Sequence, residues 1–175
     1  ATMAAFARDH QMLWRPHAKM HKSAELARLL VQAGAVGACV QKTSEAEALV
    51  AGGVTDIYIS NEVISLSKLE RVAHMARALE AKNGQISIAV DSVEGIRRLA
   101  AALDKVHASM RVFVEIDVGQ NRCGVQPGAP ALALAQEVLR HPQLHFAGLQ
   151  AYHGKAQHLR SAAARAEAIQ HVVQA

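Results

Sequence analysis

The sequence predicts an α/β protein built as a (β/α)8 barrel, of which about six βα units are present. Short apolar runs alternate with amphipathic helical segments, and the runs recur roughly every 20–35 residues, which indicates parallel strands joined by helices. Two folds have that pattern, the barrel and the doubly wound Rossmann sheet. The Rossmann sheet needs a glycine-rich turn after its first strand, and residues 15–22 contain no glycine. The barrel is therefore favoured.

The predicted strands are short and almost continuously apolar. The first, Leu13–Pro16, is extended because Pro16 disfavours helix at Arg15. The other five are predicted at Val36–Gln41, Asp56–Ser60, Gln85–Val90, Met110–Asp117 and Leu144–Ala151.

Capping residues and glycines bound the predicted helices. Ser23 is expected to cap a helix over Ala24–Ala33 that Gly34 ends, and the next helix starts at Thr43 and ends at Gly52. The remaining helices are predicted at Ser65–Lys82, Ser92–Lys105, Ala129–Arg140 and Arg160–Val173. Residues 1–13 also follow a helical pattern. Because a full barrel has about 250 residues, we expect residues 1–175 to be one partial barrel domain of a longer protein.

Composition excludes several classes of protein. The 175 residues carry 19 Lys and Arg against 15 Asp and Glu, a net charge of +4 without a basic stripe, and only 3% are aromatic. Nucleic-acid binding is therefore not expected. No apolar run approaches the roughly 20 residues of a membrane span, and no secretory signal is visible. Cys39 and Cys123 fit no zinc or redox spacing, which indicates a reducing, cytoplasmic location.

Polar residues collect where the predicted strands end. In a barrel, the active site lies at the carboxyl ends of the strands. The polar segments at these ends are Arg15–Lys22, Gln41-Lys42, Ser60–Glu62, Asp91, Glu115–Gly124 and Gln150–His158. This distribution predicts a binding site there.

The first of these segments contains Lys19 among other cations. Partial desolvation and the neighbouring charges of Arg15 and Lys22 favour a neutral amine, which is the form that attacks a carbonyl. Two alternatives stay open. Lys19 can be an ordinary loop lysine that extends to water, or His17 and His21, four residues apart, can bind a metal, although no third ligand is near in the sequence.

Five segments together resemble the D-threonine aldolase family, which belongs to the alanine racemase-like, fold-type III enzymes that use pyridoxal phosphate. The resemblance runs from about Leu13 to the end, with the segments in the order of the family. The segments are Arg15–Lys22, Val40–Ala46, Ile59–Glu62, Asp117–Gly124 and Gly148–Gly154. Related enzymes are D-serine dehydratases, D-threo-3-hydroxyaspartate dehydratases and 3-hydroxy-D-aspartate aldolases.

The resemblance implies a cofactor site. Lys19 would bind pyridoxal phosphate covalently, Arg122 would donate to its phenolic oxygen, and Tyr152 would lie beside its ring. Alanine racemases hold that arginine with a carbamylated lysine seven residues earlier. Here that residue is Glu115, so we expect a Glu115–Arg122 ion pair to replace the carbamate.

The resemblance also implies a residue for the substrate and two further pocket residues. His158 matches a histidine proposed to act as acid and base on the substrate hydroxyl. Gln41 would be a pocket residue that binds the cofactor, and Asn61 a supporting one. The family uses a divalent metal (Mn, Mg or Zn) whose ligands lie in a C-terminal domain, so no metal ligand is expected within this chain.

The implied function is a lyase that acts on small D-3-hydroxy amino acids. Retro-aldol cleavage to glycine and an aldehyde is the main interpretation, and dehydration is the alternative. A homodimer is expected for the full-length protein. Two other classes stay open: a non-catalytic carrier of pyridoxal phosphate, which would not need His158, and a barrel hydrolase, for which only Glu115 and Asp117 are suitable carboxylates.

Overall fold

Five parallel strands form one sheet in chain order, β1-β2-β3-β4-β5. The structure, a computed structural model, describes residues 2–175. The strands are β1 (Ala38–Val40), β2 (Asp56–Ile59), β3 (Gln85–Val90), β4 (Met110–Glu115) and β5 (Leu144–Gln150). Each strand pairs in parallel with the next along the chain, which requires a crossover connection between them. The α/β fold class, an incomplete barrel, is confirmed.

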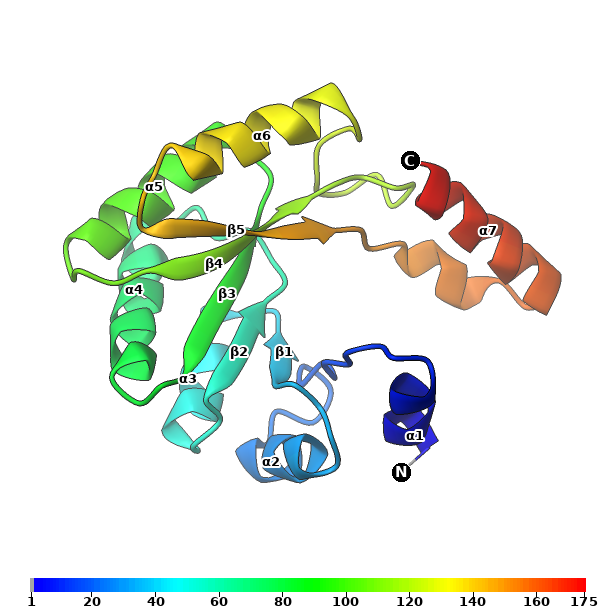
Figure 1. Cartoon of the computed structure of the whole chain (residues 1–175), viewed down its shortest axis with the longest axis horizontal. Helices are drawn as coiled ribbons and strands as arrows, with labels where there is room; N and C mark the ends of the chain where they lie inside the picture. Colours follow the sequence, from blue (N-terminus) through cyan, green and yellow to red (C-terminus); the bar gives the residue numbers. More distant parts are fainter. Residues whose placement is uncertain (1) are drawn as a thin grey trace.

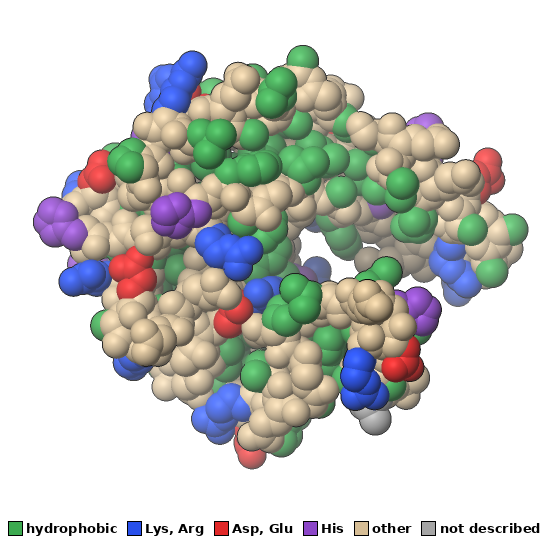
Figure 2. Space-filling view, viewed as in Figure 1, with side chains coloured by type: hydrophobic (Ala, Val, Ile, Leu, Met, Phe, Trp, Pro, Cys, Tyr) green, Lys and Arg blue, Asp and Glu red, His purple; other side chains and the backbone are tan. Residues whose placement is uncertain are grey.

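Helices alternate with these strands, as predicted. They are α1 (Thr2–Asp9), α2 (Ala24–Gln32), α3 (Thr43–Ala51), α4 (Leu66–Glu80), α5 (Val93–Asp104), α6 (Ala129–Leu139) and α7 (Ala162–Gln174), with a 3-10 helix η1 (Gly154–His158). Helices α3–α6 cover the outer face of the curved sheet, whereas α1 and α7 lie apart from it (Figure 1). The molecule is hollowed between α1, α7 and the inner face of the sheet (Figure 2).

The first predicted strand, Leu13–Pro16, is wrong as a strand. Only an isolated parallel bridge forms, between His17 and Cys39. The segment still runs along β1, because the Cys39 N–H donates to the Pro16 carbonyl and the Ala18 N–H donates to the Cys39 carbonyl, at 2.9 and 2.7 Å. Pro16 has no N–H to donate, so a regular ladder cannot form there. The bridge nevertheless brings residues 17–19 to the end of β1.

The two faces of the sheet differ in polarity. In β2, Ile57 and Ile59 are fully buried, while the alternating Asp56 and Tyr58 are half-buried. This period of two shows that one face packs on the helices and the other faces the barrel interior. In β1 and in residues 86–90 of β3, by contrast, both faces are buried, so the prediction of strands covered on both faces holds there and fails in β2.

Local capping fixes where the helices begin. The Ser23 side chain accepts from the Leu26 N–H, as predicted, and Ser92 does the same for Gly95, each at 3.2 Å. Both cysteines are free thiols, Cys39 buried and Cys123 partly exposed. Within residues 2–175, no helix has the length and apolarity needed to cross a membrane.

Candidate active site

A cavity of about 390 Å³ opens at the carboxyl ends of the strands, and its size is typical of a small-molecule site. Its lining contains four residues that the sequence predicted for the site, Lys19, Gln41, Arg122 and Tyr152. The other lining residues are Arg15, His17, Cys39, Tyr58, Ser60, Gln150 and Ala151. The strand-end loops therefore converge as the barrel interpretation predicted.

The loop that carries Lys19 is a tight turn anchored on buried Ala18. The N–H groups of His21 and Lys22 both donate to the Ala18 carbonyl, at 3.2 and 2.7 Å. The Lys19 N–H donates to Nδ1 of His17 at 3.2 Å. Lys19 itself is exposed, which corrects the expectation of partial desolvation: the cavity is open on this side.

The loop after β4 places Arg122. The Asp117 carboxylate accepts from the N–H groups of Gly119 and Asn121, each at 3.0 Å, and these contacts lower the pKa of Asp117. Gly124 has φ +93°, and a Cβ there would lie 2.7 Å from the Ile116 carbonyl carbon, so only glycine fits. The turn thus returns the chain to β4 and leaves Arg122 at the cavity.

The loop after β5 places Tyr152 against Arg122. The Arg122 guanidinium carbon lies 5.7 Å from the centre of the Tyr152 ring, within the range of a cation–π contact. Gln157 Nε2 donates to the Tyr152 hydroxyl at 3.1 Å. A Cβ on Gly154 would lie 2.7 Å from that hydroxyl oxygen, so a larger residue there would displace the Tyr152 ring. A cation and an aromatic face therefore meet in one wall.

His158 and Asn61 lie away from this wall. His158 ends η1, is exposed and does not line the cavity. Asn61 is half-buried, and its side chain donates to the Glu62 carbonyl at 3.5 Å. The structure does not bring either residue to Lys19, so their roles stay predictions.

Glu115 and Arg122 do not form the ion pair that the sequence predicted, so that prediction is wrong for the structure described here. Gln150 Nε2 donates to the Glu115 carboxylate, and Gln150 Oε1 accepts from the Tyr58 hydroxyl. Burial and the neighbouring Glu62 carboxylate raise the pKa of Glu115 to about 8, while Gln150 and Arg122 oppose that shift. Glu115 thus lies beneath the cavity with Gln150 between it and Tyr58.

Sequence reasoning missed Tyr58 as a residue of the cavity, although it placed Ser60 and Gln150 in the polar segments at the strand ends. Tyr58 lies within β2, two residues before Ser60. Alternation within this strand could have found it, because every second residue of a barrel strand faces the interior.

Metal ligation by His17 and His21 gains no support. The Nδ1 atom of each accepts a backbone N–H, from Lys19 and from Ser23. Among residues 2–175, a different set brings three ligand atoms within 4.8 Å of one another: Glu62, Asp91 and Cys123. The Asp91 carboxylate of this set already accepts a hydrogen bond, because the Gly124 N–H donates to it at 3.2 Å.

Comparison with known proteins identifies relatives of one kind. The chain is 46% identical over 165 residues to a D-threonine aldolase from an Arthrobacter species, covering 94% of this chain and 42% of that protein. A D-threonine aldolase structure from Filomicrobium marinum matches with a TM-score of 0.93 and 42% identity, covering 98% of this chain and 45% of that one.

A D-threo-3-hydroxyaspartate dehydratase from Delftia sp. HT23 matches with a TM-score of 0.83 and 26% identity, over 97% of this chain and 44% of that one. The chain thus spans less than half the length of the relatives it matches.

The sequence also matches the family model named alanine racemase, N-terminal domain, over residues 6–175, almost the whole chain. The chain belongs to the alanine racemase N-terminal domain family.

Proposed function

We propose that the protein is a pyridoxal phosphate-dependent lyase that cleaves D-3-hydroxy amino acids to glycine and an aldehyde, as a D-threonine aldolase does. The observation that carries the proposal is that Lys19, Arg122 and Tyr152, from three separate loops, line one cavity. Similarity to two D-threonine aldolases supports the reaction type.

The residues present fit the cofactor. Pyridoxal phosphate needs a primary amine for its aldehyde, a donor for its phenolic oxygen and a flat contact for its ring. Exposed Lys19 offers the amine, and Arg122, which lies over the Tyr152 ring, offers five N–H donors. Gln41 lines the same cavity and adds amide donors and an acceptor.

When bound, pyridoxal phosphate supplies an electron sink for the bonds of the substrate's α-carbon. Lys19 would hold the cofactor through its side-chain amine, and Arg122 and Tyr152 would keep the ring in place. His158 takes the proton of the β-hydroxyl, the Cα–Cβ bond breaks, and an aldehyde leaves. Lys19 would then supply a proton to the α-carbon, in balance with the one that His158 removed, and glycine would leave.

The wider assignments belong to the proposal as well. Residues 1–175 are a partial barrel domain, and the divalent metal expected for the substrate hydroxyl takes its ligands from outside this chain. The full-length protein acts on a small-molecule substrate as a cytoplasmic homodimer. None of these assignments changes the role of Lys19.

Borohydride reduction tests the central step. In the full-length protein loaded with pyridoxal phosphate, reduction followed by peptide mapping is expected to place the pyridoxyl group on Lys19. Lys155, an exposed lysine after β5, is the matched control, and Lys155→Ala should label as the wild type does. A label on another lysine, or unchanged labelling of Lys19→Ala, rejects the proposal.

Dehydration is the second candidate, because the fold also matches a D-threo-3-hydroxyaspartate dehydratase. In that reaction Lys19 removes the α-proton and hydroxide leaves from the β-carbon. Products separate the two candidates: glycine and an aldehyde indicate cleavage, whereas a 2-oxo acid and ammonia indicate dehydration.

A further inference from the structure

An imidazole connects the Lys19 loop to two neighbouring strand ends. Nδ1 of His17 accepts the Lys19 N–H at 3.2 Å, and Nε2 of the same ring lies 3.5 Å from Oγ of Ser60. Ser60 Oγ in turn donates to the carbonyl of Val40 at 3.2 Å. Val40 ends β1 and Ser60 directly follows β2. The His17 ring therefore ties three adjacent segments together at the cavity wall.

Only one protonation state fits this chain of hydrogen bonds. A backbone N–H can only donate, so Nδ1 of His17 must keep its lone pair. A neutral imidazole then carries its hydrogen on Nε2 and donates it to Ser60, whose own hydrogen is directed to Val40. Each of these two hydrogens then has an acceptor.

We propose that His17 is a positioning residue whose neutral, Nε2-protonated form holds the Lys19 backbone and so fixes where the Lys19 amine enters the cavity. The inference rests on the proposed function, because it gives Lys19 the task of carrying the cofactor. When Nδ1 of His17 is protonated, its N–H faces the Lys19 N–H, and the hydrogen bond between the two residues is lost.

The surroundings keep the ring neutral near pH 7. Burial, followed by the charge of Lys19, lowers the pKa of His17 below 6.5, while the Glu45 carboxylate of α3 and the Cys39 backbone of β1 oppose that shift. The hold on Lys19 is therefore present at neutral pH and is lost as the pH falls through the lowered pKa of His17.

His21 offers a matched control. Its Nδ1 accepts the Ser23 N–H at 3.1 Å, the same local arrangement as in His17. The His21 ring, however, does not line the cavity and belongs to the other side of the turn. A substitution there changes the turn without touching the link to Ser60.

The first arm of the test needs no cofactor. Nitrogen NMR of the full-length protein with labelled histidine is expected to show His17 protonated on Nε2 alone at pH 7.5, its signals being those lost in His17→Asn. Protonation on Nδ1 overturns the proposal. This arm does not involve pyridoxal phosphate, so it stays valid even if Lys19 does not bind the cofactor.

The second arm measures the affinity of the apo protein for pyridoxal phosphate from pH 5 to pH 9. His17→Phe has no acceptor and is expected to bind roughly 2- to 10-fold more weakly at pH 8. His17→Asn can accept the N–H two residues on and does not titrate, so it should bind within about 2-fold at pH 8 and lose part of the decline on acidification.

His21→Asn is expected to keep the wild-type profile. Identical profiles for His17→Asn and the wild type overturn the proposal. If Lys19→Ala binds the cofactor as tightly as the wild type, the proposed function fails, and the first arm alone then decides whether His17 holds the loop.

Discussion

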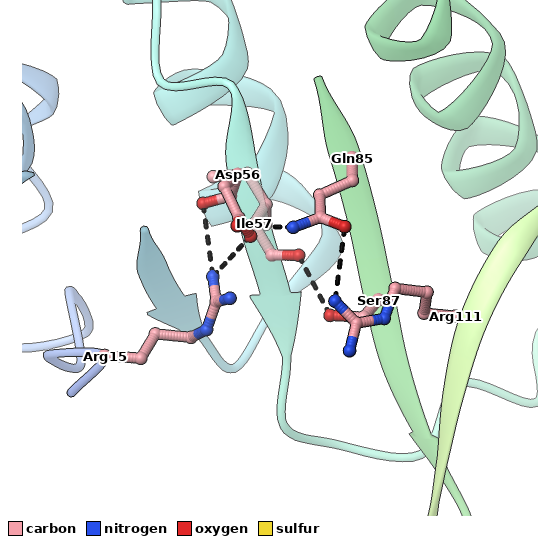
Figure 3. Close-up of polar contacts among 6 residues, drawn as sticks. All are labelled: Arg15, Asp56, Ile57, Gln85, Ser87 and Arg111. Carbon is pink, nitrogen blue, oxygen red and sulfur yellow. Dashed lines mark hydrogen bonds and ion pairs between the residues drawn. The ribbon is translucent and has the colours of Figure 1, made fainter. Parts of the chain in front are cut away.

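The two ends of the barrel strands use polar residues in opposite ways. At the amino ends of β2–β4, the Asp56 carboxylate accepts from Arg15, which also lines the cavity, at 2.5 Å and from Gln85 at 2.6 Å. Arg111 donates to Gln85 at 3.3 Å (Figure 3). At the carboxyl ends, Lys19 and Arg122 are exposed to the cavity and have no carboxylate partner within residues 2–175.

This difference distinguishes polar groups that stabilise the fold from those available to a ligand. In the amino-end network, each oxygen of the Asp56 carboxylate already accepts from a protein donor, Arg15 on one and Gln85 on the other. Ser87 of β3 adds a bond to the Ile57 carbonyl at 3.3 Å (Figure 3). Free donors gather at the other end, where barrel enzymes bind substrates.

The largest effect is expected from His158. Although His158 is exposed and lies outside the cavity lining, His158→Ala removes the group that we propose takes the hydroxyl proton. The rate of product formation should therefore fall by roughly 10²–10⁴-fold, the usual contribution of a general base. The visible absorbance of bound pyridoxal phosphate should stay unchanged. Normal turnover, or loss of that absorbance, contradicts the assignment.

The second-largest effect is expected on the free energy of unfolding, from a substitution of Asp56 in the amino-end network. Asp56→Asn removes the charge opposite Arg15 and directs an amide donor at one of its two donating neighbours, so the free energy of unfolding should fall by about 2–4 kcal/mol in urea. The control is Glu47→Gln, which breaks the exposed Glu47–Arg71 pair and should cost less than about 1 kcal/mol. Equal losses would refute the stabilising role of this network.

Secondary structure was largely predictable because its causes are local. Residues 85–90 form β3 with the predicted bounds, and Ser23 and Ser92 cap helices where the sequence places them. The strand predicted at residues 13–16 failed because proline disrupts a ladder that its neighbours otherwise begin.

Contacts inside the barrel were not predictable, because they join distant residues. Tyr58 and Gln150 are 92 positions apart, and no periodicity links them. The spacing of seven residues suggested that Glu115 pairs with Arg122. Gly119, Asn121 and Gly124 all have positive φ, and in the turn that they form the Arg122 guanidinium lies over the Tyr152 ring instead.

The smallest effect is expected at two buried glutamates, Glu115 and Glu137, whose surroundings shift their pKa values in opposite directions. Glu137 accepts from Arg97 and Arg140, each at 2.7 Å, and these contacts lower its pKa. Glu115 has a second carboxylate, Glu62, beside it, and burial raises its pKa to about 8. A raised pKa means that the folded state binds the proton more tightly than the unfolded state, so this contribution to stability is present below pH 4.5 and is lost as the pH rises to 8.

Glu115→Gln cannot ionise and keeps an acceptor for Gln150, so at pH 8 it should be more stable than the wild type by about 1 kcal/mol, with a smaller gain at pH 5. Glu137→Gln has the opposite sign: its contribution is present above pH 4.5 and is lost on acidification, so this variant should be less stable than the wild type at pH 8. Urea unfolding at both pH values measures both changes. A stability loss in Glu115→Gln at pH 8 would show that Glu115 is charged and paired, as the sequence first suggested.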